Sequence, residues 1–148
     1  MLPTLNSEEA NTSTNIAQGS GATIKSVRSA NPTLVIEREP LDWSTVKKST
    51  GETRWEHIQS HGVHNILKPI QGVFDSDPVL TTQQAWLRGQ LLGVKPFTDP
   101  ATGCDIYLVP MGGCVGWQGG YNGTGAALSD IRIVTQPGTT NIITAHPQ

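Results

Sequence analysis

The C-terminal end of the sequence constrains the fold more than any other part of it. The segments IRIVT (Ile131–Thr135) and NIITA (Asn141–Ala145) are rich in β-branched residues, which favour strands. The segment QPGTT separates them, and its Pro137-Gly138 pair is a turn signal. The pattern predicts an antiparallel β-hairpin over these residues.

The two faces of this hairpin differ in chemistry. If Arg132 pairs with Thr144, residues that alternate along the two strands project to the same face. One face then collects a cation, a hydroxyl and an imidazole, and it consists of Arg132, Val134, Ile142, Thr144 and His146. The other face is wholly apolar and consists of Ile131, Ile133, Ile143 and Ala145. We expect the second face to pack in the core.

The first of two predicted helices lies in TGETRWEHIQSHG. Thr53 and Glu56 have the spacing of a capping box, although Ser49 or Thr50 could cap the helix instead. Gly62 suits a left-handed cap at its C-terminal end.

The second predicted helix lies in TTQQAWLRGQLLG. Thr81 or Thr82 is expected to cap it, and Gly93 is expected to end it. Its apolar stripe is expected to consist of Trp86, Leu87 and Leu91.

Outside the hairpin, the β-favouring segments are shorter. DIYLVPM (Asp105–Met111) predicts a strand, and TLVIERE (Thr33–Glu39) predicts an edge strand. GGCVGWQGGYNGTGAA, over residues 112–127, has the pattern of a long glycine-dense loop of the kind that often carries function. Helices before strands predict an α+β fold with N-terminal helices packed on one face of a twisted antiparallel sheet.

Length and composition limit the possible architectures. A chain of 148 residues is most simply a single domain. Residues 1–32 are rich in Ser, Thr, Asn, Ala and Gly, which indicates a flexible linker or the remnant of an entry segment, so the folded domain is expected over residues 33–148. The N-terminus lacks the pattern of a signal peptide.

Charge and cysteine content argue against a protein that binds nucleic acid non-specifically and against a zinc ribbon. The formal net charge of −2 is unlike the basic balance of proteins that bind nucleic acid non-specifically. Cys104 and Cys114 are the only cysteines and form no CxxC motif, so a zinc ribbon is excluded. A disulfide between them and two free thiols both stay open.

The histidines and the polar hairpin face suggest RNA cleavage by internal transfer. His57 and His61 are four residues apart and share one helix face. One neutral histidine can take the proton of a ribose 2′-hydroxyl, while a second, protonated one can donate a proton to the departing 5′-oxygen. The candidates are His57, His61 and His146, and the sequence leaves open which is base and which is acid. Arg132 and Thr144 can stabilise the charge that develops on the phosphorane. This reaction requires no metal or other cofactor.

The same residue types also suit simpler roles. His146 could be a solvated tail residue, and Arg132 and Lys68 could be ordinary surface charges. His57, His61 and His64 could together bind zinc as a hydrolase site, although HExxH is absent. The chain could also be a non-catalytic secreted binding or structural module that uses the glycine-rich loop from Gly112 to Gly125, with Trp117 and Tyr121 as contacts.

Three segments resemble a known family. WEHIQSHG…KPIQGVF, AWLRG and the C-terminal IRIVTQPGTTNIITAHP resemble the toxin domains of bacterial polymorphic and contact-dependent inhibition systems. The resemblance is to the barnase/EndoU/colicin/RelE superfamily of ribonucleases and covers roughly residues 50–148. It implies one or two helices before a twisted antiparallel sheet.

The resemblance also implies roles for individual residues. His57 and His61 correspond to candidates for the general base, Arg132 to the residue that holds the phosphate, and Thr144 to the threonine of the closing motif. His146 stands where many relatives have tyrosine, which is a departure from the family's pattern. Lys68 corresponds to a cation that is frequent in the family. Lys68 is a candidate for substrate binding, and so are Trp117 and Tyr121 of the glycine-rich loop, to which the resemblance assigns no role.

For biology, the resemblance implies a metal-independent toxin that cleaves tRNA to a 2′,3′-cyclic phosphate during competition between bacteria. Such toxins are secreted as the C-terminal part of a larger effector and delivered to the cytoplasm of the target cell. The family implies a cognate immunity protein that blocks the active site. The near-neutral charge further implies reliance on a few placed contacts and on a host cofactor protein. No apolar run approaches the roughly 20 residues needed to span a bilayer, so no stable membrane insertion is expected.

Overall fold

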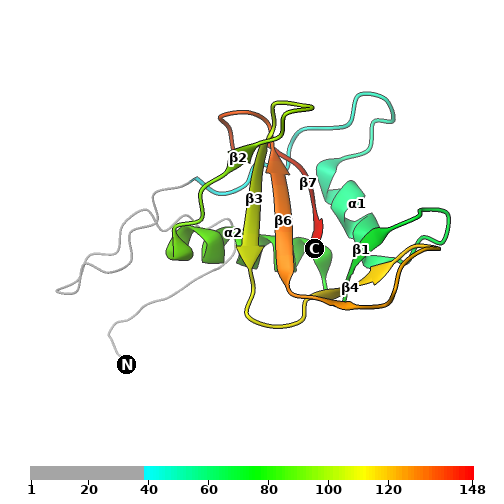
Figure 1. Ribbon diagram of the computed structural model, residues 1–148. Coiled ribbons are helices and arrows are strands. Elements are labelled where there is room, and N and C mark those ends of the chain that lie inside the picture. The colour runs from blue at the N-terminus through cyan, green and yellow to red at the C-terminus, as the bar shows by residue number, and fades with distance from the viewer. Residues whose placement is uncertain (1–38) are drawn as a thin grey trace. The chain divides into compact units, whose positions relative to one another are not determined.

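The computed structural model describes residues 39–148 (Figure 1). Of these, Leu41–Gln148 form one compact unit. The predicted linker over residues 1–32 lies outside the described residues, and so does the predicted edge strand apart from its last residue, Glu39. No helix within residues 39–148 has the length and apolar character needed to cross a membrane.

The fold is α+β, as predicted, but it contains two antiparallel sheets rather than one. The helical elements are α1 (Arg54–Gln59), the short 3-10 helix η2 (Ser60–Gly62) and α2 (Pro78–Leu92). The strands are β1 (Gln71–Phe74), β2 (Phe97–Thr98), β3 (Asp105–Pro110), β4 (Gly116–Gly119), β5 (Ala127–Leu128), β6 (Asp130–Thr135) and β7 (Ile142–Pro147).

The four-stranded sheet has the order β2-β3-β6-β7 and carries the core. Helix α2 packs against β3, β6 and β7, and α1 packs against β7 and α2 (Figure 1). Trp86 of α2 meets Tyr107 of β3 edge to face, with ring centroids 4.9 Å apart. Ile131, Ile133 and Ala145 are fully buried, which confirms these three as members of the predicted core face.

The C-terminal hairpin forms as predicted, but its register is different. Arg132 pairs with His146 rather than with Thr144, and Thr144 pairs with Val134. Because the shift is two residues and strand side chains alternate with a period of two, Arg132, Thr144 and His146 still share one face.

A β-bulge corrects the core assignment of the two adjacent isoleucines. The register shifts between Val134 and Thr135, which leaves Ile143 as an extra residue in β7. Ile142, predicted on the polar face, is therefore fully buried, and Ile143, predicted in the core, is only partly buried.

Helix α1 begins where the capping box predicts. The Thr53 hydroxyl accepts from the Glu56 N–H at 3.0 Å, and the Glu56 carboxylate accepts from the Thr53 N–H at 3.1 Å. The prediction for Gly62 was wrong, because Gly62 ends a 3-10 turn and does not adopt the left-handed conformation. A side chain is excluded there for a different reason, since a Cβ would lie 2.9 Å from the Pro78 ring.

Helix α2 starts earlier than predicted and buries a different face. Asp77 caps it through a 3.0 Å bond from the Leu80 N–H, and Pro78 follows, so neither Thr81 nor Thr82 is the cap. Gly93 ends the helix in the left-handed conformation, as predicted. Of the predicted stripe only Trp86 is buried, while Leu87 and Leu91 are exposed. The buried residues of α2 are Pro78, Val79, Thr81, Thr82, Ala85, Trp86 and Gly89.

The second sheet, of order β1-β4-β5, lies largely in the segment predicted to be a loop. Its glycines allow close approach to the end of β7. A Cβ on Gly72 would lie 2.0 Å from the Pro147 carbonyl oxygen, and one on Gly116 would lie 2.6 Å from the Pro147 ring. The high glycine content of this segment is therefore partly a packing requirement between β7 and the three-stranded sheet.

Candidate active site

Two histidines meet at the end of α1. His57 lies in α1 and His61 one turn later in η2, with the buried Ile58 anchoring the helix between them. Their Nε2 atoms are 3.4 Å apart, and the rings are nearly perpendicular with centroids 4.9 Å apart. The predicted shared face is confirmed, and the two rings contact each other directly.

Thr144 of β7 completes a triangle with these two rings. Its Oγ1 lies 3.1 Å from His57 Nε2 and 3.3 Å from His61 Nε2. Helix α1 packs against β7, so a residue near the end of the chain reaches histidines more than eighty positions earlier. The strand and helix candidates predicted from the sequence therefore form one cluster.

Glu52 favours one arrangement of the protons within this triangle. Its Oε1 lies 3.5 Å from His57 Nδ1, so a neutral His57 with its proton on Nδ1 presents a bare Nε2 to the cluster. The Thr144 hydroxyl can then donate to His57 Nε2 and accept from a protonated His61 Nε2. This assignment satisfies all three groups with one chain of hydrogen bonds running from His61 to Glu52.

His146 lies beside the triangle on the same strand as Thr144. Its ring centroid is 5.9 Å from that of His61. The neighbour across the hairpin is Arg132. His146 Nδ1 lies 3.0 Å from the Pro147 carbonyl oxygen, which can only accept, so that nitrogen carries a proton and Nε2 of the neutral ring is bare.

All three clustered histidines favour the neutral form. Burial, followed by the adjacent His57 and His146 rings, lowers the pKa of His61 to about 3. Burial also lowers the pKa of His57, although the Glu52 carboxylate partly offsets this effect. Burial lowers the pKa of His146, and its bond to the Pro147 carbonyl acts in the opposite direction.

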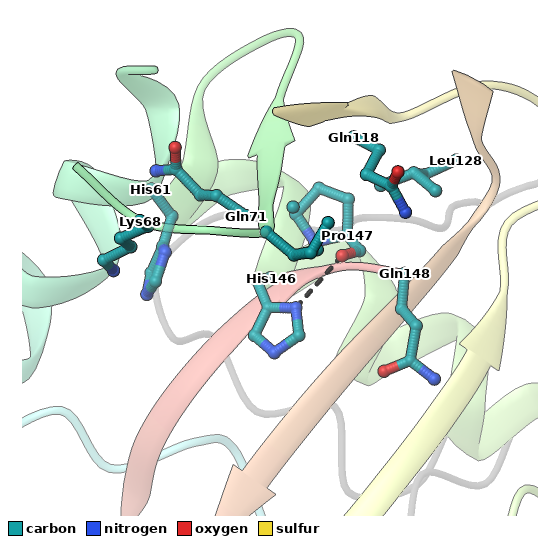
Figure 2. A pocket seen from close by; sticks show the side chains of 10 residues that line it. His61, Lys68, Gln71, Gln118, Leu128, His146, Pro147 and Gln148 are labelled. Atoms are coloured by element: carbon teal, nitrogen blue, oxygen red, sulfur yellow. Dashed lines mark hydrogen bonds between the residues drawn. The ribbon is translucent and has the colours of Figure 1, made fainter. Parts of the chain in front are cut away.

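A cavity of about 360 Å³ opens beside the cluster. Figure 2 shows His61 and Lys68 on one side of it, Gln118 and Leu128 on the other, and His146 with Pro147 between them. His57 and Thr144 do not line the cavity, but both contact His61, which does. The cavity is within the size range of small-ligand sites.

The predicted substrate-binding residues separate into two places. Lys68 lines the cavity, and its carbonyl oxygen accepts from the Tyr121 N–H at 2.8 Å. Trp117 does not line the cavity and packs against His64, and the Tyr121 side chain is 63% exposed. Of the three, only Lys68 is brought to the histidine cluster.

The predicted zinc set is not brought together. The His64 ring lies edge-on to Trp117 with centroids 4.9 Å apart, and its Nε2 accepts from the Gly120 N–H at 2.9 Å. Among residues 39–148, no group of three His, Cys, Asp or Glu side chains is placed to hold a metal ion. Cys104 and Cys114 are free thiols and form no disulfide.

Glu52 and Gln118 belong to the site but were not predicted from the sequence. Glu52 directly precedes the Thr53 cap, and His57, which was predicted, is the fourth residue of the helix. In many helices an apolar pair packs together at these two positions. That spacing could have indicated their contact, here made by a carboxylate and an imidazole. Gln118 has no such signal, because it reaches the cavity only through the pairing of β4 with β1.

No family model, no curated protein and no solved structure matches the chain. The support for any function therefore comes from the geometry of this site and from the sequence resemblance.

Proposed function

We propose that the chain is a metal-independent endoribonuclease in which a ribose 2′-hydroxyl attacks the adjacent phosphorus and leaves a 2′,3′-cyclic phosphate. The observation that carries the proposal is the convergence of His61, His146 and Lys68 on one cavity, with Thr144 and His57 behind His61. Two imidazoles and a cation are the groups that this reaction needs.

His61 is the group that takes the proton of the 2′-hydroxyl. It is 8% exposed and neutral at neutral pH, so it can accept a proton from a substrate in the cavity. The Thr144 hydroxyl can pass a proton on to His57, where the cation lies beside the Glu52 carboxylate. This route moves the positive charge away from the most buried ring.

His146 then serves as the acid. As the bond from the 2′-oxygen to phosphorus forms, the bond to the 5′-oxygen breaks, and His146 donates its proton to that oxygen. Burial lowers the pKa of His146, and the positive charges of Arg132 and Lys68 lower it further. A bound phosphodiester offsets both cations, so substrate binding favours the protonated ring.

Arg132 and Lys68 supply the positive charge that the pentacoordinate phosphorane requires. Arg132 lies opposite His146 across the hairpin, and Lys68 lines the cavity. No carboxylate within residues 39–148 forms an ion pair with either side chain, so both remain available to a phosphate.

The biological setting belongs to the same proposal and is supported by the sequence resemblance. The substrate is tRNA, and the chain is the toxin part of a larger secreted effector that acts in the cytoplasm of a target bacterium. A cognate immunity protein blocks the cavity, and a host protein can serve as a cofactor. No metal takes part.

Incubation of the full chain with total bacterial tRNA in EDTA tests the proposal. A parallel reaction receives a bacterial extract, as a source of any host partner. We expect cleavage that is lost, by roughly 10²- to 10⁴-fold in rate, when His61 or His146 is changed to alanine. Single alanine changes at His57, Arg132 and Thr144 should also weaken cleavage, and Lys95→Ala, an exposed change, should not.

Intact tRNA under both conditions would remove the proposal. Full activity in all five site variants, together with native circular dichroism spectra, would leave the cleavage but remove the assigned site. A protein encoded immediately downstream should inhibit the wild-type chain if it is the cognate immunity protein.

A further inference from the structure

The side-chain amide of Gln118 has a fixed orientation at the wall of the cavity. One terminal atom, assigned as Oε1, lies 3.1 Å from the Thr124 backbone nitrogen and 3.1 Å from the Thr124 hydroxyl. A backbone N–H can only donate, so the atom facing it must be the oxygen of the amide. Thr124 therefore fixes which end of the Gln118 amide is oxygen and which is nitrogen.

This orientation makes Gln118 a donor toward any ligand. Its carbonyl oxygen has two acceptor sites, and Thr124 occupies both. The Nε2 group has no partner among the hydrogen bonds of residues 39–148 and keeps two N–H donors. Glutamine pairs with adenine through one donor and one acceptor, and here the acceptor is already used.

The rest of the cavity suits a planar aromatic ring beside a phosphate. Ile70, Leu128 and Pro147 contribute apolar walls, and Lys68, His61 and His146 lie on the side of the phosphate chemistry. Figure 2 shows Gln118 across the cavity from Lys68 and His61. Apolar walls with a few oriented polar groups are the usual means by which proteins hold single-stranded RNA bases.

We propose that this cavity is a nucleobase subsite that selects bases with a carbonyl oxygen on the edge facing Gln118, namely uracil, cytosine or guanine, and disfavours adenine. The inference rests on the proposed ribonuclease function, because it assigns the base of the nucleotide whose phosphate lies at His61 and His146. Gln118 is the specificity-determining residue, and Thr124 positions it.

Nucleotide binding tests this directly, without any cleavage. Titration calorimetry of the full chain with 3′-UMP, 3′-CMP, 3′-GMP and 3′-AMP measures the preference among the four bases. We expect 3′-AMP to bind about three- to tenfold more weakly than 3′-UMP. A ring nitrogen of adenine can accept from Gln118, but the adenine amino group beside it then faces a donor and finds no acceptor, because Thr124 occupies the Gln118 oxygen. Equal affinity for the two nucleotides, or no binding of any of the four, would overturn the subsite.

Variants of Gln118 separate specificity from packing. Gln118→Ala should bring the 3′-UMP to 3′-AMP ratio close to one. Gln118→Glu keeps an acceptor for Thr124 but replaces the donor with a carboxylate, which can accept from the adenine amino group, so it should reverse the preference between 3′-UMP and 3′-AMP. Thr124→Val should improve binding of 3′-AMP, because it frees one acceptor site on Gln118. Gln83→Ala, an exposed glutamine of α2, is the matched control and should keep the wild-type ratio.

Failure of the inference can be distinguished from failure of the proposed function. If the chain cleaves tRNA but neither nucleotide binding nor cleavage position depends on the base or on Gln118, the subsite is wrong and the ribonuclease stands. If the base preference and its dependence on Gln118 are present but no RNA is cleaved, the subsite stands and the catalytic proposal fails.

Discussion

At the scale of single residues, the Thr144 hydroxyl connects the neutral imidazole rings of His57 and His61. This hydroxyl is within 3.3 Å of both Nε2 atoms, and no other side chain joins them to each other in the part of the chain that the structure describes. Thr144→Val keeps the shape of the side chain but removes the hydroxyl. We expect the RNA cleavage rate to fall about ten- to a hundredfold, as for a lost partly buried hydrogen bond of about 1–3 kcal/mol.

Thr144→Ser is the matched control, because it restores the hydroxyl while losing only a methyl group. It should recover most of the cleavage rate. If the valine variant were as fast as the wild type, the proton would not pass through this hydroxyl.

The depressed pKa of His61 also predicts how stability depends on pH. Folded His61 has a pKa of about 3 against an ordinary value of 6.5, so below 6.5 the unfolded chain binds a proton that folded His61 does not. Stability is therefore lost as pH falls from 6.5 toward 3, and His57 and His146 act in the same direction. His61→Gln should lose less stability than the wild type over this range, measured by urea unfolding at a series of pH values.

Lys95→Gln, an exposed change away from the cluster, should keep the wild-type dependence. An unchanged acid dependence in His61→Gln would show that the folded protein holds this histidine no differently from the unfolded chain.

At the scale of secondary-structure elements, the close approach of β1 and β7 depends on Gly72. A Cβ there would meet the Pro147 carbonyl oxygen at 2.0 Å and the His146 Nδ1 atom at 3.4 Å. Gly72→Ala should therefore displace the end of β7, destabilise the fold by about 1–3 kcal/mol and reduce cleavage. The free energy of unfolding from denaturant titration measures the first effect.

Gly113→Ala is the control for this substitution, because a Cβ on Gly113 meets nothing within 4 Å and its backbone is not left-handed. Its stability should stay within about 0.5 kcal/mol of the wild type. Equal stability of the two alanine variants would contradict the proposed packing of β7 on the three-stranded sheet.

Local patterns predicted the elements better than they predicted how those elements meet. The capping box at Thr53 and the turn at Pro137-Gly138 depend on neighbouring residues, and both elements formed where expected. The bulge at Ile143 and the exposure of Leu87 depend on packing partners that are distant in the sequence. The three-stranded sheet was missed because its strands are only two to four residues long and β1 and β4 contain glycine, so they lack a periodic pattern.

The candidate site was predicted only in part, again because local patterns do not encode the packing of distant segments. Strand side chains alternate with a period of two, so the predicted hairpin placed Arg132, Thr144 and His146 on one face correctly, even though its register was wrong by two residues. Which histidine faced the cavity depended on the packing of α1 against β7, which no local pattern encodes.

At the scale of the whole molecule, the formal net charge of −2 constrains the proposed binding of RNA. Lys68 lines the cavity, and Arg132 does not line it but lies opposite His146 across the hairpin, so binding through these two cations should release few counterions. We expect the logarithm of the association constant for single-stranded RNA to fall with the logarithm of salt concentration with a slope of about −1.4 for two phosphate contacts. Fluorescence anisotropy with the His61→Ala variant, which leaves the RNA intact, measures this slope.

Lys68→Ala and Arg132→Ala should each make the slope shallower by about 0.7. A wild-type slope several times steeper would show that RNA binds over a wider basic surface than the site provides. An unchanged slope in both variants would remove these two residues as phosphate contacts.

The chemistry of the cut ends tests the central claim most directly. The full chain is incubated in EDTA with a tRNA that it cleaves, and the termini of both fragments are identified by mass spectrometry. Attack by the ribose 2′-hydroxyl predicts a 2′,3′-cyclic phosphate on the upstream fragment, a 5′-hydroxyl on the downstream fragment and no cut when that 2′-hydroxyl is replaced by hydrogen. A 5′-phosphate on the downstream fragment, or cleavage of the 2′-deoxy substrate, would contradict the account.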